Sequence, residues 1–244
     1  MEKLRKKLDA FVASLSTKKR AELQNRLSNL ISVYPFNEYE YIISCLLGMG
    51  KITLEDYYEL RDDYISRNMY LYIFEIAGPR TFGEQWAQGH LKELVPSLIK
   101  PTKHHDQNYS GEYDFVLKTK KHNLIIIEVK ASRAVDADSR EPLAVKALSF
   151  VSKVPFDMNF QQVKPKCCEV FVWIAVWRDV IKHWVLASKE VEQNRYYSTG
   201  QHRGNQGEGQ LHIKSDNIKF FEQYEVEPAK LEDGIIKAYK RQVS

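Results

Sequence analysis

Apolar residues recur at helical spacing through the first part of the chain. The first set is Leu4, Leu8, Phe11, Val12 and Leu15, and the second is Leu23, Leu27, Leu30 and Ile31. Thr53 then precedes a third segment, residues 54–77, whose first turn is acidic, as the helix dipole favours. This spacing predicts helices over residues 1–77, and a further helix begins at Thr81.

Further along the chain, two short apolar runs are separated by a polar turn, which is the pattern of a β-hairpin. The first run is residues 115–117, and the turn is residues 118–123. The second run, residues 124–127, consists mostly of β-branched side chains, which favour strands. The sequence therefore predicts two paired strands in the middle of the chain.

Three charged residues are expected to meet at one end of this hairpin. Glu128 and Lys130 follow the second apolar run, and the alternation of a strand places both on one face. Asp114 opens the first strand, so pairing of the strands can bring it beside Glu128. Two carboxylates and an ammonium at the end of a buried hairpin are costly without a partner. A divalent cation is the natural partner, because hard cations take carboxylate oxygens.

Two later segments extend the predicted sheet. Residues 168–176 form a continuous apolar run, which is typical of a buried central strand. Residues 181–187 alternate and pair naturally with that strand, and residues 142–151 have the spacing of a helix that packs on the sheet. The pattern predicts the α/β (α+β) class, with a mixed central β-sheet flanked by helices. We expect a helical N-terminal region, residues 1–77, and a core, residues 78–244.

The composition is that of an ordinary globular protein, with 43% hydrophobic and 28% charged residues in a chain of 244. The net charge of +4 is compatible with nucleic-acid binding, but so mild a balance does not indicate it by itself. Cys45, Cys167 and Cys168 make no disulfide framework, and with no signal peptide visible they indicate a reducing cytoplasm. No apolar run is long enough to span a bilayer, so no membrane partner is expected.

The order of the charged residues also carries a family resemblance. Asp114, followed by a hydrophobic strand that ends in Glu128-Val129-Lys130, resembles the PD-(D/E)xK phosphodiesterase core. Many type II restriction endonucleases and other DNA nucleases share that core. Tyr113 stands where the name of the motif has proline. The resemblance covers residues 84–215 and implies a restriction-endonuclease-like fold that hydrolyses DNA to leave 5′-phosphate and 3′-hydroxyl ends.

The resemblance also implies roles for four residues. Asp114 and Glu128 would hold Mg²⁺ against the scissile phosphate, and Lys130 would orient or deprotonate the attacking water. In this family a glutamate on the helix before the hairpin completes the metal site, and Glu84 has that position. Thr81 and Glu84 also match a capping box, in which Glu84 would only satisfy a backbone N–H. Both roles for Glu84 stay open at this point.

Two loops carry side chains suited to DNA recognition. Residues 196–210 hold four glycines among Arg, Asn and Gln side chains, which hydrogen-bond base edges in the major groove. A disordered surface loop is the alternative for this composition. The blunt-cutting branch of type II restriction enzymes uses a loop of this kind, together with a glutamine-rich loop before the motif aspartate. The DNA-binding candidates are Arg203, Asn205, Gln206, Gln201 and Gln210 in the first loop, and Gln107 and Asn108 in the second.

The sequence thus predicts a Mg²⁺-dependent, sequence-specific double-stranded DNA endonuclease of a type II restriction-modification system. A homodimer is expected, because two-fold dimers read palindromic sites, with residues 1–77 as a dimerisation or DNA-clasping part. The alternatives are a structure-selective repair or recombination nuclease and a DNA-binding module without catalysis. A long base-reading loop disfavours the nuclease alternative, and the joint presence of Asp114, Glu128 and Lys130 disfavours the module.

Overall fold

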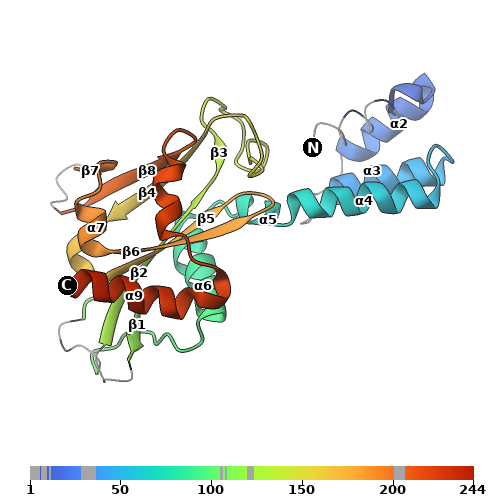
Figure 1. The fold of residues 1–244 in the computed structure, drawn as a ribbon. Helices are drawn as coiled ribbons and strands as arrows, with labels where there is room; N and C mark the ends of the chain where they lie inside the picture. The colour runs from blue at the N-terminus through green and yellow to red at the C-terminus, as the bar shows by residue number, and fades with distance from the viewer. Residues whose placement is uncertain are drawn as a thin grey trace. The chain divides into compact units, whose positions relative to one another are not determined.

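The computed structural model of the protein (Figure 1) describes residues 6, 10, 12–28, 37–104, 107, 109–119, 124–200 and 207–244. The chain divides into two compact units, Met1–Tyr72 and Ile73–Ser244. The sequence predicts a boundary after residue 77, close to this division. Among the residues described, no helix is both long and apolar enough to cross a membrane.

The first unit is helical, as its apolar spacing predicts. In the described part of this unit the helices are α2 (Thr17–Ser28), α3 (Asn37–Gly48) and α4 (Leu54–Asn68). The helix predicted over residues 54–77 therefore ends at Asn68, and a separate short helix, α5 (Leu71–Phe74), follows at the boundary. Thr53 caps α4 as predicted: its Oγ1 accepts a hydrogen bond from the Asp56 N–H, and the Asp56 carboxylate accepts one from the Thr53 N–H. One cluster of buried residues in this unit consists of Ile43, Leu46, Ile52, Leu60 and Tyr64.

The second unit contains two four-stranded sheets. The first has the order β1-β2-β5-β6, with β1 (Phe115–Lys118), β2 (Leu124–Arg133), β5 (Val170–Val176) and β6 (Ile181–Ala187). It is mixed, because β2 pairs in parallel with β5 while β1 and β6 pair antiparallel to their neighbours. The predicted hairpin, the predicted pairing of the two later strands and the predicted mixed sheet are confirmed.

The second sheet was not predicted. It is antiparallel and has the order β3-β4-β8-β7, with β3 (Val135–Asp136), β4 (Phe156–Val163), β8 (Gly209–Lys214) and β7 (Tyr197–Thr199). Trp173 of β5 stacks on Phe160 of β4, with ring centroids 4.9 Å apart. Both rings are fully buried, so the two sheets share one core, where each large side chain stabilises the fold by about 2 kcal/mol.

Helices cover the first sheet and complete the second unit. A π-helical turn, η1 (Thr81–Ala87), continues into α6 (Gln88–Leu94) and packs against β2, while α9 (Leu231–Val243) lies across β6 and β5 (Figure 1). The smaller elements are α7 (Ser188–Glu192), α8 (Ile218–Phe221) and the 3₁₀ turns Pro165–Cys167, Glu222–Tyr224 and Pro228–Lys230. The predicted helix at Thr81 is confirmed, with a wider first part than an α-helix.

Residues 142–151 do not form the predicted helix. The backbone of this segment instead forms hydrogen bonds with residues 134–136. The Leu148 N–H donates to the Ala134 carbonyl, and the Asp136 N–H donates to the Lys146 carbonyl. Val145 and Val151 are 68% and 81% exposed. Ala147 in the same segment is buried at 2% exposure, so the apolar residues are divided between surface and core, and their helical spacing gives a misleading prediction.

The prediction that residues 196–210 form one loop is wrong at both ends, because Tyr197–Thr199 form β7 and residues 209–210 begin β8. β7 and β8 pair antiparallel, with Thr199 opposite Gly209. Gly209 is tightly enclosed there, because a Cβ atom built on it would lie 2.4 Å from the Ser198 carbonyl oxygen and 2.5 Å from the Tyr197 ring. Only glycine fits this position without a shift of the neighbouring strand.

Gly209→Ala should therefore destabilise the second unit by about 1–3 kcal/mol, the usual cost of overpacking. Gly89→Ala in α6 is the matched control, because a Cβ atom there meets nothing within 4 Å, and helix propensity favours alanine. Urea unfolding of both variants and the wild type measures the difference. Equal stability of the two variants would show that Gly209 is not required by its surroundings.

Candidate active site

The β1–β2 hairpin brings together three of the four predicted catalytic residues, Asp114, Glu128 and Lys130. The register Phe115↔Ile127 puts Asp114, just before β1, opposite Glu128 in β2. The Asp114 N–H donates to the Ile127 carbonyl at 3.0 Å, and the Val129 N–H donates to Asp114 Oδ2 at 2.8 Å. Lys130 Nζ lies 2.7 Å from Glu128 Oε1. Strand pairing thus fixes two carboxyls and an ammonium side by side.

These groups are largely withdrawn from water. The Glu128 and Lys130 side chains are only 12% and 17% exposed. Burial raises the pKa of the Glu128 carboxyl to about 7, and the Asp114 charge adds to this rise while Lys130 opposes it. Burial likewise raises the pKa of Asp114, against the hydrogen bond from the Val129 N–H. The two carboxyls also share a hydrogen bond, so together they favour a proton or a cation between them.

Two further residues, which the sequence did not single out, contact this pair. Gln88 Nε2 donates to Asp114 Oδ1, and Lys100 Nζ donates to Gln88 Oε1. Burial lowers the pKa of Lys100, while Asp114, Glu128 and Glu84 raise it. The available signal was helical spacing, because Gln88 lies four residues after Glu84 and thus on the same face of the predicted helix.

The helix that carries Gln88 is anchored at both ends by stacked rings. The Arg133 guanidinium of β2 lies 4.2 Å from the centre of the Phe82 ring. Trp86 stacks between Phe82 and His90, and His90 stacks on His183 of β6. The wider π-turn ends at Ala87, directly before Gln88, and such turns occur often at functional sites.

Glu84 lies on the exposed side of this helix. Its side chain is 63% exposed and lies 3.5 Å from the Arg80 guanidinium. The residue before the helix is Arg80, and it makes no side-chain capping bond, so the capping box of Thr81 and Glu84 is not formed. Glu84 does not touch the carboxyl pair, although its charge acts on Lys100. Its proposed part in a metal site stays a prediction.

The carboxyl pair fits Mg²⁺ by the chemistry of its oxygen donors. Among the residues described, no group of three or more His, Cys, Asp or Glu side chains could hold a metal ion. Mg²⁺ is commonly bound by one or two carboxylates together with waters and substrate phosphates. Asp114 and Glu128 supply that smaller set, and because burial raises the pKa of both carboxyls, a bound cation would favour their charged forms.

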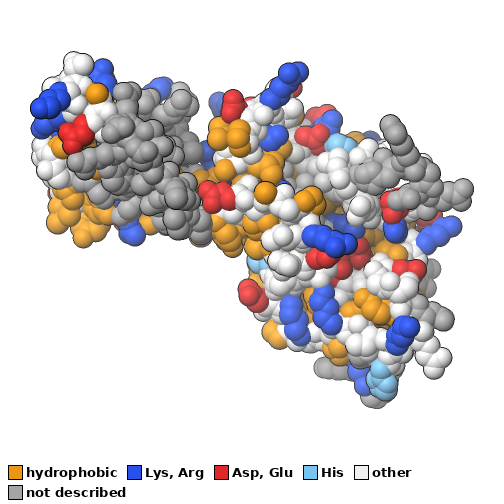
Figure 2. Space-filling view, turned by 180° about the vertical axis from the view of Figure 1, so that it is seen from behind, with side chains coloured by type: hydrophobic (Ala, Val, Ile, Leu, Met, Phe, Trp, Pro, Cys, Tyr) orange, Lys and Arg blue, Asp and Glu red, His pale blue; other side chains and the backbone are white. Residues whose placement is uncertain are grey.

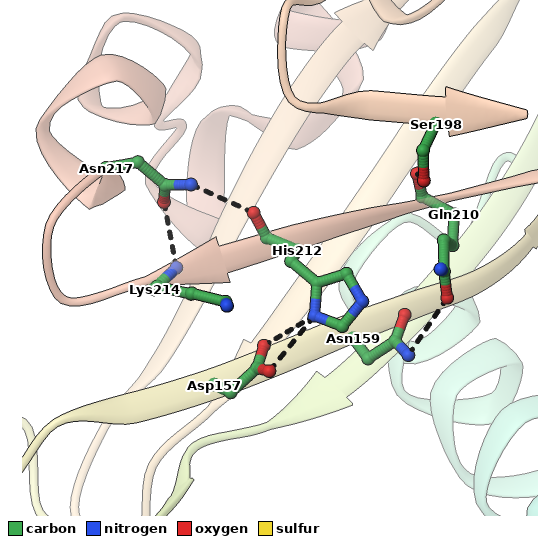
Figure 3. A network of polar contacts seen from close by, with 7 residues as sticks. All are labelled: Asp157, Asn159, Ser198, Gln210, His212, Lys214 and Asn217. Carbon is green, nitrogen blue, oxygen red and sulfur yellow. Dashed lines mark hydrogen bonds and ion pairs between the residues drawn. The ribbon is translucent and has the colours of Figure 1, made fainter. Parts of the chain in front are cut away.

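The predicted DNA-binding residues are only partly described. Gln107 is exposed in a turn. Gln210 of β8 accepts a hydrogen bond from Asn159 of β4 at 3.3 Å, and His212 pairs with Asp157 at 2.8 Å on the same polar face of the second sheet (Figure 3). The candidates that lie outside the described residues are Arg203, Asn205, Gln206, Gln201 and Asn108.

Glu128→Gln should change how stability depends on pH. The pKa of Glu128 is about 7 in the folded protein against an ordinary value of 4.5, so its contribution to stability is present at low pH and lost as pH rises through about 7. In EDTA, the wild type should lose stability relative to Glu128→Gln between about pH 5 and about pH 8. The expected size is on the order of 1 kcal/mol per unit of pKa difference.

Urea unfolding at both pH values measures this difference, and Glu84→Gln, which alters an exposed carboxylate, is the control. An unchanged difference between wild type and Glu128→Gln across the pH range would contradict the raised pKa.

No family model, no curated protein and no solved structure matches this chain. Its function is therefore inferred from the side chains at the end of the β1–β2 hairpin.

Proposed function

We propose that the protein is a metal-dependent endonuclease that cleaves double-stranded DNA. The observation that carries the proposal is the pairing of Asp114 with Glu128 across the hairpin, with Lys130 on the same face of β2. Three lysines surround these carboxyls: Lys130, Lys100 and Lys164 all interact electrostatically with Glu128. A site with two carboxylates for a cation and several ammonium groups for an anion suits a phosphodiester substrate.

Asp114 and Glu128 would hold the metal ion, which when bound polarises a phosphoryl oxygen and makes water a better nucleophile. Asp114 is prepared for this by the Val129 N–H, which fixes the orientation of its carboxylate. Glu128 is held in turn by the Lys130 ammonium. Both ligands are therefore oriented before substrate arrives, as efficient catalysis requires.

Lys130 is the group placed to act on the attacking water. One of its three N–H donors faces Glu128, and the others can donate to the water or to a phosphate oxygen. In the hydrolysis, a bond forms between the water oxygen and phosphorus while the bond from phosphorus to the 3′-oxygen breaks. The 3′-oxygen takes up a proton, which leaves a 3′-hydroxyl and a 5′-phosphate. Lys130 would stabilise the negative charge that develops on the phosphate.

Sequence-specific cleavage is the form of this activity that we favour. The segment between β7 and β8 combines glycines with Arg, Asn and Gln side chains, which can hydrogen-bond base edges in the major groove. On the face seen in Figure 2, basic and acidic side chains lie intermixed, so binding there would rest on local contacts more than on a broad basic surface. Recognition through base contacts, with little reliance on a broad basic surface, is compatible with a type II restriction enzyme that acts as a homodimer on a palindromic site.

A digest of several large plasmids with Mg²⁺ tests this function directly. Discrete bands are expected for a sequence-specific enzyme. Nicking that depends on supercoiling or on junctions would favour a repair or recombination nuclease. Binding without cleavage would favour a DNA-binding module, and then the proposed activity is wrong.

Asp114→Asn should abolish most cleavage, by about 1000-fold, because it removes the charge of one of only two carboxylate ligands. Binding of duplex DNA in EDTA should be retained or become tighter, because a negative charge near the phosphate is lost. Lys130→Ala should show the same separation of rate from binding. The control is Asp138→Asn, which alters an exposed carboxylate. Cleavage by Asp114→Asn at the wild-type rate would rule out the assigned site.

Glu84→Gln should lower the cleavage rate by about 10- to 100-fold at an unchanged Tm if Glu84 supports the metal site. A residue that only stabilises the helix would instead lower the Tm and leave the rate unchanged. Arg80→Gln is the matched control, because it breaks the same ion pair while keeping the carboxylate. Rate and Tm of both variants distinguish the two roles, and a less stable but fully active Glu84→Gln would contradict the metal-site role.

A further inference from the structure

Lys100 lies beside the two carboxyls of the proposed active site and is not part of the sequence motif. Both Asp114 and Glu128 act on its charge. In the part of the chain that the structure describes, the acceptor of its hydrogen bond is the amide of Gln88 and not a carboxylate. An ammonium beside two carboxylates but paired with neither keeps its charge available for another anion.

The backbone around Lys100 is fixed to the catalytic hairpin. The neighbouring Ile99 exchanges two hydrogen bonds with Val116 of β1, both 2.9 Å long. The Lys100 ammonium also lies 4.3 Å from the centre of the Phe115 ring, a contact that favours a cation. Lys100 is nevertheless exposed. Its charge is thus held at a set place and remains open to a ligand from solution.

Gln88 links Lys100 to Asp114 in one orientation only. A lysine ammonium has donors and no acceptor, so the Gln88 amide must turn its oxygen towards Lys100. Its NH₂ group then faces Asp114 Oδ1, to which it donates. The other Asp114 oxygen already accepts from the Val129 N–H. Gln88 therefore fixes the carboxylate and the ammonium relative to each other.

The charges of the site leave room for a doubly negative group. With both carboxylates ionised, a bound divalent cation would balance them. Lys164 is paired with Glu208, so Lys130 and Lys100 would remain as two positive charges. A phosphodiester carries one negative charge, and a second develops as the attacking water loses its proton. Lys130 alone would balance only the first of these. The Lys100 ammonium would balance the second negative charge. Because that charge develops only during the reaction, balancing it stabilises the transition state more than the bound substrate and so raises the rate.

We infer that Lys100 binds a non-bridging oxygen of the scissile phosphodiester, and that Gln88 positions the Lys100 ammonium for this contact. This inference rests on the proposed nuclease function and adds a substrate-binding residue to it. Because Lys100 comes from the segment before β1 and Gln88 from the start of α6, the phosphate is held from outside the hairpin motif.

Lys100→Met tests the inference, since it removes the charge and keeps the stem against Phe115. Affinity for a random duplex in EDTA, titrated across a salt series, should fall, and the salt slope should decrease by about 0.9, the value for one lost phosphate contact. Cleavage of plasmid DNA at saturating concentration should fall by about 100-fold. Lys100→Arg, which keeps the charge, should recover part of the affinity for duplex DNA and part of the cleavage rate. Lys103→Met removes a charge from the same exposed segment and should change the rate little.

The outcomes separate this inference from the proposed function. If the wild type cleaves, Asp114→Asn does not, and Lys100→Met behaves as Lys103→Met in both rate and salt slope, then Lys100 binds no phosphate. If the wild type cleaves no DNA, the proposed function is wrong and this inference falls with it.

The positioning role of Gln88 has its own measurement. Gln88→Leu should lower the rate at an unchanged Tm. The loss of rate in Gln88→Leu with Lys100→Met should be smaller than the product of the two single losses, because both changes remove the hydrogen bond between Gln88 and Lys100, while only Gln88→Leu also removes the one to Asp114. Gln85→Leu, one turn earlier and exposed, is the control. If the loss of rate in the double variant equals the product of the two single losses, Gln88 acts independently of Lys100.

Discussion

The pairing of β1 with β2 forces two carboxyls, Asp114 and Glu128, into contact inside the protein. Their repulsion and their removal from water both disfavour the charged forms. The strands cannot slip to relieve this, because a shift by one residue would turn the buried Ile125 and Ile127 out of the core. The apolar face of β2 therefore fixes the register, and the register maintains an arrangement of carboxyls that local electrostatics alone would not adopt.

The surrounding framework holds this arrangement rigidly. β5 lies parallel to β2 and is buried along its whole length. Trp173 in β5 stacks on Phe160 of the second sheet, and the Arg133 contact with Phe82 ties the helix that bears Gln88 to the end of β2. The aromatic side chains in these contacts, Phe82, Phe160 and Trp173, are buried, and the loss of such a side chain costs several kcal/mol. The stability of the core thus offsets the unfavourable carboxyl pair, as is common where function needs charges in contact.

Prediction from sequence succeeded where periodicity and burial coincide. The hairpin, the pairing of β5 with β6 and the cap at Thr53 all follow from local patterns, and the meeting of Asp114 with Glu128 follows from the hairpin. It failed at residues 142–151, where backbone bridges to β3 replace a helix. The second sheet has short strands joined across long separations, which leave no local signal. Helical spacing from Glu84 could have indicated Gln88, but the role of Lys100 arises from a contact between segments and leaves no signal in the spacing of one.

One ion pair shows how the second sheet bears on the carboxyl pair. Lys164, directly after β4, lies 2.9 Å from Glu208, directly before β8, at the base of the segment that joins β7 to β8. The pKa of Lys164 is raised chiefly by its hydrogen bond to Glu208, and Glu128 adds to the rise. The Lys164 ammonium is therefore attracted both by Glu208 and by Glu128. Coulomb interactions are reciprocal, but the Lys164 side chain is 49% exposed, so water and salt screen its effect on Glu128. The two sheets are thus linked chiefly by the buried stack of Trp173 on Phe160, and only weakly by charge.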